Sequence, residues 1–232
     1  MLQPLTRAKF EQLIPTIATG AQYAYYWGKW QNTLNRLLIS VVSIVVVLIL
    51  GLIVGESGQA LILLLAIIAG FYWLWSPIYQ ASMRNVKARR FKYSGYWSSR
   101  IQEVYLTEEL IGEEETVNQR GELVIVENRE RRINLVLADE TGFYVTIQAP
   151  LQRIHKGIKV GQRAESLLLS NREDLATVDK ITDAYIPSQN LWIGSYPWLQ
   201  RDVFLEVSRQ LGGSDNYAPQ YDRSIRRRRK YQ

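Results

Sequence analysis

The side chains that could do chemistry are few in this chain of 232 residues. It contains no cysteine and a single histidine, His155. Thiol catalysis, disulfides, iron–sulfur ligation and zinc sites built from several cysteines or histidines are therefore excluded. The sequence has no phosphate-binding loop, dinucleotide-binding glycine motif or nucleophile elbow. It therefore predicts no catalytic residue, no metal site and no cofactor.

Two groups of ionisable residues could still act chemically, namely His155 and a cluster of glutamates. His155 lies in a polar stretch with no serine, carboxylate or second histidine nearby to act with it, which predicts an ordinary surface residue. Five glutamates gather around one expected turn: Glu108, Glu109, Glu113, Glu114 and Glu115. They could bind a cation or a basic partner, but the pattern is more typical of a solvated acidic loop. An enzyme is not predicted, and a membrane-bound enzyme with an unfamiliar site stays an alternative.

Aromatic residues form two dense runs, YAYYWGKW at residues 23–30 and FYWLWSPIY at residues 71–79. In the first run most rings recur at spacings of three and four residues, which places them on one face of a helix. Such rings could stack on bases, line a chlorophyll or haem pocket, or form a belt at a membrane surface. The belt is favoured, because tryptophan and tyrosine prefer the headgroup region. Its predicted members are Tyr23, Tyr26, Trp27, Trp30, Phe71, Tyr72, Trp73, Trp75 and Tyr79.

Two apolar stretches must position these rings. Residues 37–54 and 60–79 contain no ionisable Asp, Glu, Lys, Arg or His. Each has about the length that crosses a bilayer as a helix. Because residues 55–59 join them directly, we predict a two-helix transmembrane hairpin rather than a pair of buried core helices. Small residues would let these helices pack on each other or on a partner's helix, namely Gly51, Gly55, Ala66 and Gly70.

Charge is strongly segregated, although the net charge is only +6. Residues 80–100 contain six basic residues and no acidic one, whereas residues 101–215 contain 12 basic and 19 acidic residues. The basic flanks of the apolar stretches predict that both termini are cytoplasmic or stromal. A nucleic-acid partner is not expected, because no second nucleic-acid-binding feature is present. The basic residues predicted to bind anionic lipid or an acidic partner are Arg84, Lys87, Arg89, Arg90, Lys92, Arg226, Arg227, Arg228, Arg229 and Lys230.

The other segments complete a membrane-anchored α+β fold, in which Thr6 is expected to cap an amphipathic helix near the N-terminus. The predicted organisation is an N-terminal interfacial segment (1–36), a transmembrane helix (37–54), a periplasmic or lumenal linker (55–59), a second transmembrane helix (60–79), a basic juxtamembrane segment (80–100), an acidic β-rich cytoplasmic domain (101–211) and a basic disordered tail (212–232).

The acidic domain is expected to be a small meander or partly closed barrel. Its strands are predicted from β-rich runs, with hairpin loops at the turn-like residues 128–131 and 139–142. Residues 197–211 carry apolar side chains at helical spacing after Pro197, which predicts a terminal helix that packs on the strands.

The N-terminal sequence PLTRAKFEQLIPTIATGAQYAYYWGKW, followed by LNRLLISVV, resembles an uncharacterised family of thylakoid membrane proteins from cyanobacteria and chloroplasts. The resemblance covers roughly residues 4–45 and the general layout. Members of that family sometimes carry a transporter-permease label, which the uncharged apolar stretches here do not favour. The resemblance implies a photosynthetic membrane as the setting.

The predicted function is a non-catalytic assembly, stability or scaffold factor for a larger membrane complex. Its expected partners are the lipid bilayer and a protein of that complex, and it could also form homo-oligomers. The alternative to this function is an accessory subunit of a transporter or a small homo-oligomeric channel.

Overall fold

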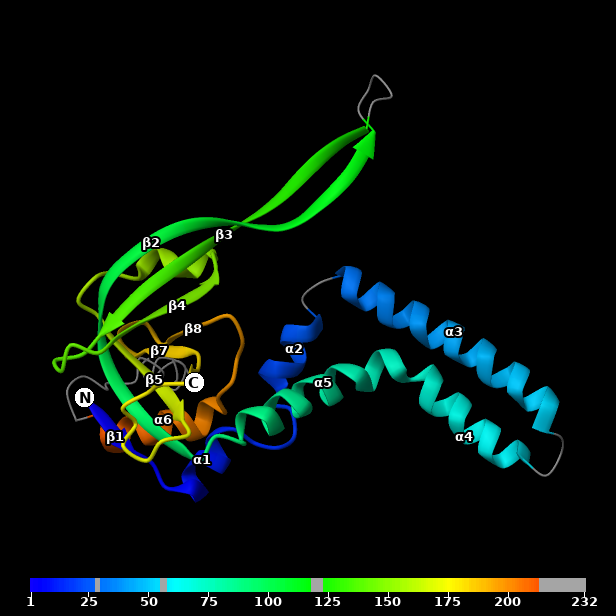
Figure 1. Cartoon of the computed structure of the whole chain (residues 1–232), viewed down its shortest axis with the longest axis horizontal. Helices are drawn as coiled ribbons and strands as arrows, with labels where there is room; N and C mark the ends of the chain where they lie inside the picture. Colours follow the sequence, from blue (N-terminus) through cyan, green and yellow to red (C-terminus); the bar gives the residue numbers. More distant parts are fainter. Residues whose placement is uncertain (28–29, 55–57, 118–122, 213–232) are drawn as a thin grey trace, which may run out of the picture. The chain divides into compact units, whose positions relative to one another are not determined.

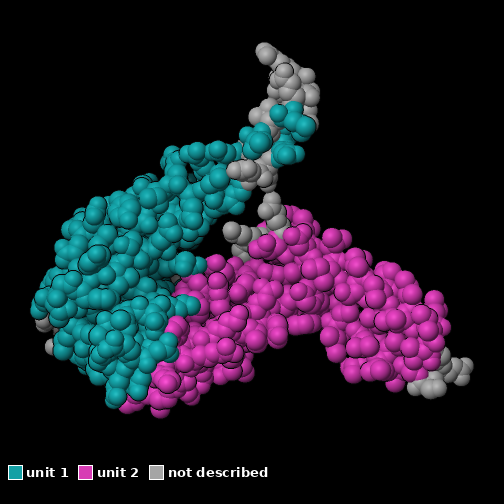
Figure 2. Space-filling model, in the orientation of Figure 1, with its two compact units in different colours: residues 1–5, 93–195, 201–232 teal, residues 6–92, 196–200 magenta. Residues whose placement is uncertain are grey.

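The computed structural model describes residues 1–27, 30–54, 58–117 and 123–212. These residues form two compact units, and each unit is assembled from separated stretches of the chain (Figure 2). Unit 1 contains residues 1–5, 93–195 and the chain from 201 onward, whereas unit 2 contains residues 6–92 and 196–200.

Unit 1 is built on an antiparallel sheet (Figure 1). The order along its main path is β4-β3-β2-β5-β7-β8, while β1 pairs with β2 and β6 pairs with β5. Its strands are β1 (Leu2–Pro4), β2 (Tyr93–Val117), β3 (Leu123–Ala138), β4 (Tyr144–Pro150), β5 (Arg163–Ser170), β6 (Lys180–Ile181), β7 (Ala184–Ile186) and β8 (Leu191–Ile193). Its helices are α6 (Arg201–Leu211) and the short 3₁₀ helices η2 (Arg153–Gly157) and η3 (Pro187–Gln189).

The long strand β2 organises this sheet. It pairs with β5 as far as Arg100 and with β3 from Arg100 to Val117. The register shifts at Gln102, where a β-bulge bends a strand and increases its twist. Beyond this point β2 pairs with β3 alone, and from Glu108 onward, where β3 no longer pairs with β4, the two strands project as a two-stranded arm (Figure 1). We call residues 102–117 of β2 and 123–131 of β3 the β2–β3 ribbon.

The core of unit 1 lies in the part of the sheet away from the β2–β3 ribbon. Trp97, Leu135 and Leu168 are fully buried there and belong to one hydrophobic cluster. Helix α6 adds Phe204, whose ring centroid lies 5.3 Å from that of Trp192. β5 is buried on both faces after Arg163, burial alternates only near the end of β4, and α6 buries one face that includes Phe204 and Val207.

Two predicted boundaries in this unit are wrong. Residues 128–131, expected as a hairpin loop, lie inside β3, where Arg131 forms an ion pair with Glu108 across the ribbon at 3.2 Å. The terminal helix begins at Arg201 and not at Pro197. The loop expected at residues 139–142 does connect β3 to β4, and Gly142 supplies the positive φ of 84° that this turn needs.

Unit 2 is helical. Its helices are α1 (Arg7–Leu13), α2 (Gly20–Trp27), α3 (Trp30–Val54), α4 (Gln59–Gly70) and α5 (Tyr72–Ala88). Thr6 caps α1 as predicted, because its hydroxyl accepts a hydrogen bond from the backbone N–H of Lys9 at 3.4 Å. Helix α3 packs along α4 and contacts α5, and α2 packs against α5.

The predicted two-helix transmembrane hairpin is wrong. Among the described residues, α3 alone is a single helix long and apolar enough to cross a membrane by length and composition. The second predicted span is broken at Phe71, where the axes of α4 and α5 differ by 71° (Figure 1). The two pass the same test only when they are taken together. The fold is thus a combination of helices and an antiparallel sheet without the predicted hairpin.

Polar groups satisfy the backbone at this break. The N–H of Trp73, which a continuous helix would direct to the residue four positions earlier, donates to the Ser40 hydroxyl at 3.0 Å. The indole N–H of Trp75 donates to the carbonyl of Ile68 at 2.9 Å. Pro77 lies inside α5 and has no N–H to donate, so it removes a further bond from the first turns of α5. Gly70 and Pro77 are residues at which helices commonly bend, and the prediction of one continuous span overlooked them.

The predicted juxtamembrane segment at residues 80–100 does not exist as one element. Helix α5 continues to Ala88, and β2 begins at Tyr93. Tyr96 and Trp97, which fall within that predicted segment, are almost fully buried in unit 1. The β-rich domain therefore begins eight residues before its predicted start at Ile101, and it also recruits β1 from the N-terminus.

Candidate functional site

The most extensive candidate surface is the apolar exterior of α3 and α4 in unit 2. Leu52 and Ile53 expose 87% and 76% of their surface, and α4 contains no buried residue. Exposed apolar patches of this extent usually mark contact with a membrane or another protein. The large exposed side chains of the two helices include Leu38, Val41, Val42, Val45, Val46, Leu48, Ile49, Leu61, Leu63, Leu64 and Ile67.

Two of the predicted small residues lie where α3 and α4 approach each other. A Cβ atom added to Gly51 would lie 3.0 Å from Ile62 Cγ2, and one added to Gly70 would lie 3.2 Å from Ile44 Cδ1. Ala66 is half-buried, whereas Gly55 is outside the described residues. These contacts belong to packing within unit 2, the alternative in which the helices pack on each other.

The two aromatic runs meet in unit 2. The rings of Trp27 and Trp73 are in edge-to-face contact, with centroids 5.7 Å apart. Within the second run Trp75 makes similar contacts to Tyr72 at 5.2 Å and to Tyr79 at 6.1 Å. The other predicted members of the belt are Tyr23, which packs on Trp27, Tyr26, which is half-buried, and Trp30 and Phe71, which are exposed.

A second aromatic cluster involves Tyr25, to which the sequence assigned no role, and the predicted belt residue Tyr26. Tyr25 contacts the ring of Tyr196 at 5.0 Å, and Tyr26 contacts it at 6.2 Å. The guanidinium of Arg84 lies 4.4 Å from the Tyr196 ring centroid and 5.6 Å from that of Trp198. Cation–π contacts of this kind hold an arginine against aromatic rings. Arg84 therefore has an internal contact that the sequence did not predict.

The other predicted basic residues divide into two groups. Arg89 forms an ion pair with Glu11 at 2.7 Å and donates to the Thr16 hydroxyl at 2.6 Å. Arg7 reaches the same carboxylate, and its hydrogen bond, followed by the charge of Arg89, lowers the pKa of Glu11. The remaining ones in this region, Lys87, Arg90 and Lys92, are exposed. Arg226, Arg227, Arg228, Arg229 and Lys230 lie outside the described residues.

Sequence reasoning missed a buried pair of amides in unit 2. Gln22 on α2 and Asn85 on α5 are both fully buried, and each donates to the other at 2.9 and 2.8 Å. Gln22 also donates to the backbone carbonyl of Trp198 at 3.2 Å. No sequence signal distinguishes these amides from exposed ones, since their partners come from distant parts of the chain.

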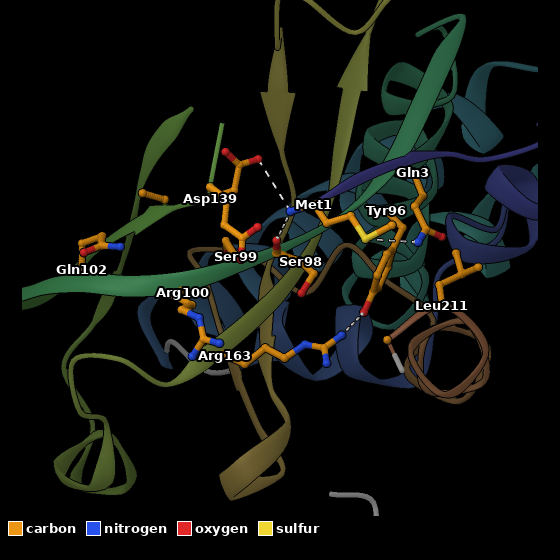
Figure 3. A pocket seen from close by; sticks show the side chains of 13 residues that line it. Met1, Gln3, Tyr96, Ser98, Ser99, Arg100, Gln102, Asp139, Arg163 and Leu211 are labelled. Atoms are coloured by element: carbon orange, nitrogen blue, oxygen red, sulfur yellow. Dashed lines mark hydrogen bonds and ion pairs between the residues drawn. The ribbon is translucent and has the colours of Figure 1, made fainter. Parts of the chain in front are cut away.

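Unit 1 contains a polar cavity of about 500 Å³ (Figure 3). It is lined by residues of β1 and β2, by Arg163 at the start of β5 and by the end of α6. The Tyr96 hydroxyl and the Arg163 guanidinium point toward each other, 3.4 Å apart. Arg100 also lines the cavity, but Asp139 and Glu140 balance the two arginines. The cavity therefore has no clear preference for a ligand of either charge.

A buried carboxylate lies next to this cavity. Glu165 on β5 is 1% exposed and forms an ion pair with Arg163 at 2.9 Å. Burial raises the pKa of Glu165, and the opposing effects of Ser208, Arg163 and Tyr96 do not outweigh it. Burial also raises the pKa of Tyr96, and the neighbouring Glu165 charge raises it further. The charged pair Arg163 and Glu165, two residues apart at the start of RAESLLLS, was the only sequence sign of this cluster.

Asp139 at the edge of the cavity is held in the ionised state. Burial alone would raise its pKa, but hydrogen bonds from the Thr141 hydroxyl and from the Trp97 indole, at 2.5 and 2.9 Å, outweigh burial and lower the pKa. Within the described ranges, no three His, Asp or Glu side chains come together as metal ligands would.

His155 is not the surface residue that the sequence predicts. It is 5% exposed, and its Nδ1 accepts a hydrogen bond from the backbone N–H of Gln152 at 3.2 Å. This contact caps η2, and burial lowers the pKa of His155. The residue has a structural role that its polar sequence neighbours did not indicate.

The predicted acidic loop is also wrong. The five glutamates from Glu108 to Glu115 lie in β2, on the β2–β3 ribbon. The ribbon also exposes apolar side chains, and Leu106, Leu110, Leu123 and Ile125 are between 48% and 75% exposed. A two-stranded ribbon is at best marginally stable in water unless its surface packs on something else. The ribbon is therefore a candidate contact surface.

The comparisons with known proteins give a family without a function. A sequence model described as "Family of unknown function (DUF8619)" matches residues 3–219. No curated protein and no solved structure matches the chain. The matched region includes every helix and strand described above except the first residue of β1. The chain therefore belongs to the DUF8619 family.

Proposed function

We propose that the protein is a non-catalytic, membrane-attached scaffold. Unit 2 would attach it to the bilayer through α3 and α4, and unit 1 would bind a protein of a larger membrane complex. The single observation that carries this proposal is the exposed apolar surface of α3 and α4. Lipid hydrocarbon is the environment that removes the cost of exposing such side chains to water.

The contacts of unit 2 support attachment from one side. Helices α2 and α5 flank the apolar segment in sequence, and the amides of Gln22 and Asn85 join them. The chain therefore enters and leaves the apolar segment at the same place. Helix α4 has 12 residues and is about 18 Å long, shorter than the hydrocarbon core of about 30 Å.

The membrane part of the proposal can be tested with vesicles. The full chain should float with phosphatidylcholine vesicles on a density gradient. A variant with Leu48→Asp and Leu52→Asp should stay at the bottom, because charged side chains on α3 are costly in hydrocarbon. Leu48→Ala with Leu52→Ala is the matched control and should still float. A wild-type chain that stays monomeric in detergent-free buffer and does not float with the vesicles would contradict attachment to the membrane.

The scaffold part requires a protein partner that recognises unit 1. Affinity purification from a mild detergent extract should recover the same membrane protein repeatedly. Leu106→Glu with Leu110→Glu on the ribbon should abolish that recovery while vesicle flotation stays unchanged. Recovery of the chain alone, with no loss of any complex when its gene is deleted, would contradict a scaffold function. The photosynthetic membrane implied by the N-terminal resemblance stays a prediction.

A further inference from the structure

In the described chain neither edge of the β2–β3 ribbon has a neighbouring strand, and the open edge of β2 is the longer one. β5 occupies that edge of β2 as far as Arg100, where it begins with Arg163. The loop before β5 makes two more backbone bonds to Ile101. From Gln102 to Val117 β2 pairs only with β3 in the described chain. An open edge of this kind offers backbone N–H and C=O groups to an added strand.

The charge of this edge defines what can bind there. Between residues 101 and 117 β2 contains six glutamates and no lysine or arginine. A second copy of the same strand would place glutamates beside glutamates, which is unfavourable. The acidic edge instead complements an extended basic segment.

Residues 213–232 carry the charge that such an edge would attract. They contain six basic residues, Arg223 and the run from Arg226 to Lys230, and two acidic residues. The segment lies outside the described residues, but its starting point is defined. Gly212 packs so closely that an added Cβ would lie 2.8 Å from Arg163 Nη2 and 3.2 Å from the Tyr96 hydroxyl. It lines the cavity of Figure 3 together with Gln102, the first residue of the open edge.

The length of the segment matches the length of the edge. Residues 102–117 extend about 53 Å at roughly 3.3 Å per residue. Twenty extended residues cover up to about 66 Å. Arg226 is the fourteenth residue after Gly212, and Glu115 is the thirteenth after Gln102. A segment that runs from Gly212 beside β2 would therefore bring the arginine run to the distal glutamates.

We propose that residues 213–232 lie along the open edge of β2, parallel to that strand, with the run Arg226–Lys230 against the glutamates of the ribbon. The segment would occupy the same edge of β2 as β5, beyond the Arg100–Arg163 pair where β5 begins. Each exposed ion pair contributes little. The segment is however tethered at Gly212, so its effective concentration at the edge is in the millimolar range and several weak pairs suffice. This inference does not depend on membrane attachment.

Hydrogen–deuterium exchange of the full chain in uncharged detergent tests the proposal. A variant that changes Arg226, Arg227, Arg228 and Arg229 to glutamate should release the segment. Backbone amides of residues 103–112 should then exchange roughly tenfold faster than in the wild type, because docking no longer protects the open edge. Amides of β4 and β5 should keep their exchange rates, which shows that the sheet itself is intact.

Charge exchange distinguishes direct pairing from an indirect effect. Glu108→Lys with Glu115→Lys should release the segment in the same way. Combining this change with the four tail glutamates should restore slow exchange, since the signs of the pair are reversed together. Glu173→Lys with Glu206→Lys makes the same change in net charge at exposed positions away from the ribbon and should have no effect.

Two results would overturn the proposal. One is unaltered exchange of residues 103–112 in both single-sided variants. The other is a segment that becomes protected only when phosphatidylglycerol vesicles are added, with no change in β2. That result would identify the segment as a lipid-binding tail.

Discussion

Gln22 and Asn85 show what a buried polar pair contributes to unit 2. Each amide satisfies the other at hydrogen-bond distance, and neither is accessible to water. Replacing Asn85 leaves one N–H of the Gln22 amide without an acceptor in a site that water does not reach, although Gln22 keeps its hydrogen bonds with Thr19 and Trp198. The cost of such an orphaned group, about 1–3 kcal/mol, exceeds the net contribution of the bond itself.

Asn85→Leu is therefore expected to lower the free energy of unfolding by about 1–3 kcal/mol. Adding Gln22→Met should recover part of this loss, because the orphaned amide is removed; the carbonyl of Trp198 still loses its donor. Denaturant unfolding in detergent would measure both changes. Gln80→Leu on the exposed side of α5 is the control and should have little effect. A loss that the second substitution deepens would contradict this account of the pair.

Glu165 makes the stability of unit 1 depend on pH. Its pKa in the folded chain is raised above the ordinary value of 4.5, so the protonated form is favoured on folding. Its contribution is fully present below pH 4.5 and is lost as the pH rises through the raised pKa. Glu165→Gln cannot ionise and should lack this loss.

Thermal unfolding of the wild type and of Glu165→Gln between pH 4 and pH 8 measures this difference. The midpoint of the variant relative to the wild type should rise as the pH rises. Asp139 has a lowered pKa and acts in the opposite sense at lower pH, but it is present in both proteins and cancels in the comparison. A difference that is constant across this range would show that Glu165 has an ordinary pKa in the folded chain.

For single residues, the sequence predicted those roles that depend on residues a few positions away in the chain. Thr6 was recognisable as a cap because the cap and its partner are three residues apart. His155 was not recognisable as buried, because burial depends on residues that fold over it from elsewhere. Tyr96, Arg163 and Glu165 form their cluster only after β2 and β5 pair, and no local pattern contains all three.

At the scale of elements, the break between α4 and α5 is the main departure from expectation. A straight helix from Leu61 to Lys87 would separate the two Cα atoms by about 39 Å, whereas a bend of 71° at Phe71 shortens the distance to about 32 Å. Because the chain has no cysteine, Leu61→Cys and Lys87→Cys can be labelled selectively with nitroxides. Pulsed electron–electron resonance should give a narrow distribution at the shorter distance. A maximum at the longer distance would show that the helix is continuous.

Ser40 is expected to fix this bend. Ser40→Ala removes the acceptor of the Trp73 N–H, a loss of about 1 kcal/mol, and should broaden the distance distribution. Ser43→Ala removes a hydroxyl three residues away on the same helix and should leave the distribution narrow. Equal broadening in both variants would mean that the bend does not depend on this hydrogen bond.

Element type was predictable wherever one pattern persisted. The uncharged run of α3 predicted a long helix, although α3 begins seven residues before the predicted span, at Trp30. The break after Gly70 was not predicted, because the uncharged run continues on both sides of it and its stabilising hydroxyl comes from α3. Gly70 and Pro77 were the only local signals of a bend. The continuity of β3 through residues 128–131 was hidden for the opposite reason, since polar residues that look like a turn pair with the acidic residues of β2.

At the scale of the whole molecule, the proposed attachment should respond to lipid charge. Lys87, Arg90 and Lys92 are exposed, whereas Arg84 and Arg89 are engaged within unit 2. Each free basic residue near an anionic surface contributes about 1 kcal/mol. Changing the three to glutamine should therefore weaken binding to phosphatidylglycerol-containing vesicles by roughly 100-fold. Binding to phosphatidylcholine vesicles should not change, since the apolar helices are intact.

The matched control changes three exposed basic residues of unit 1, Arg153, Lys156 and Lys159, to glutamine. Sedimentation or flotation at fixed ionic strength would measure both variants. An equal loss in the two would show that only net charge matters. An unchanged affinity in the first variant would show that this part of α5 and its continuation do not reach the lipid surface.

The division into units was not predictable by reading along the sequence. Composition changes sharply near residues 36, 80 and 101, and the predicted boundaries follow these changes. The structure divides the chain at Leu5, Lys92 and Ser195 instead, because β1 joins β2 in unit 1 and residues 196–200 join unit 2. Pairing between distant segments decides these divisions, and it leaves no trace in local composition.

This interlaced arrangement has a consequence for how the protein is made. A ribosome delivers β1 first, but β2, its partner in the sheet, emerges about ninety residues later. The hydrogen bond from the Gln200 N–H to the Leu13 carbonyl, at 2.8 Å, closes unit 2 only after two hundred residues have been synthesised. Neither unit can be completed in order during translation. The nascent chain must carry its apolar helices in an unfinished unit until Gln200 has been synthesised.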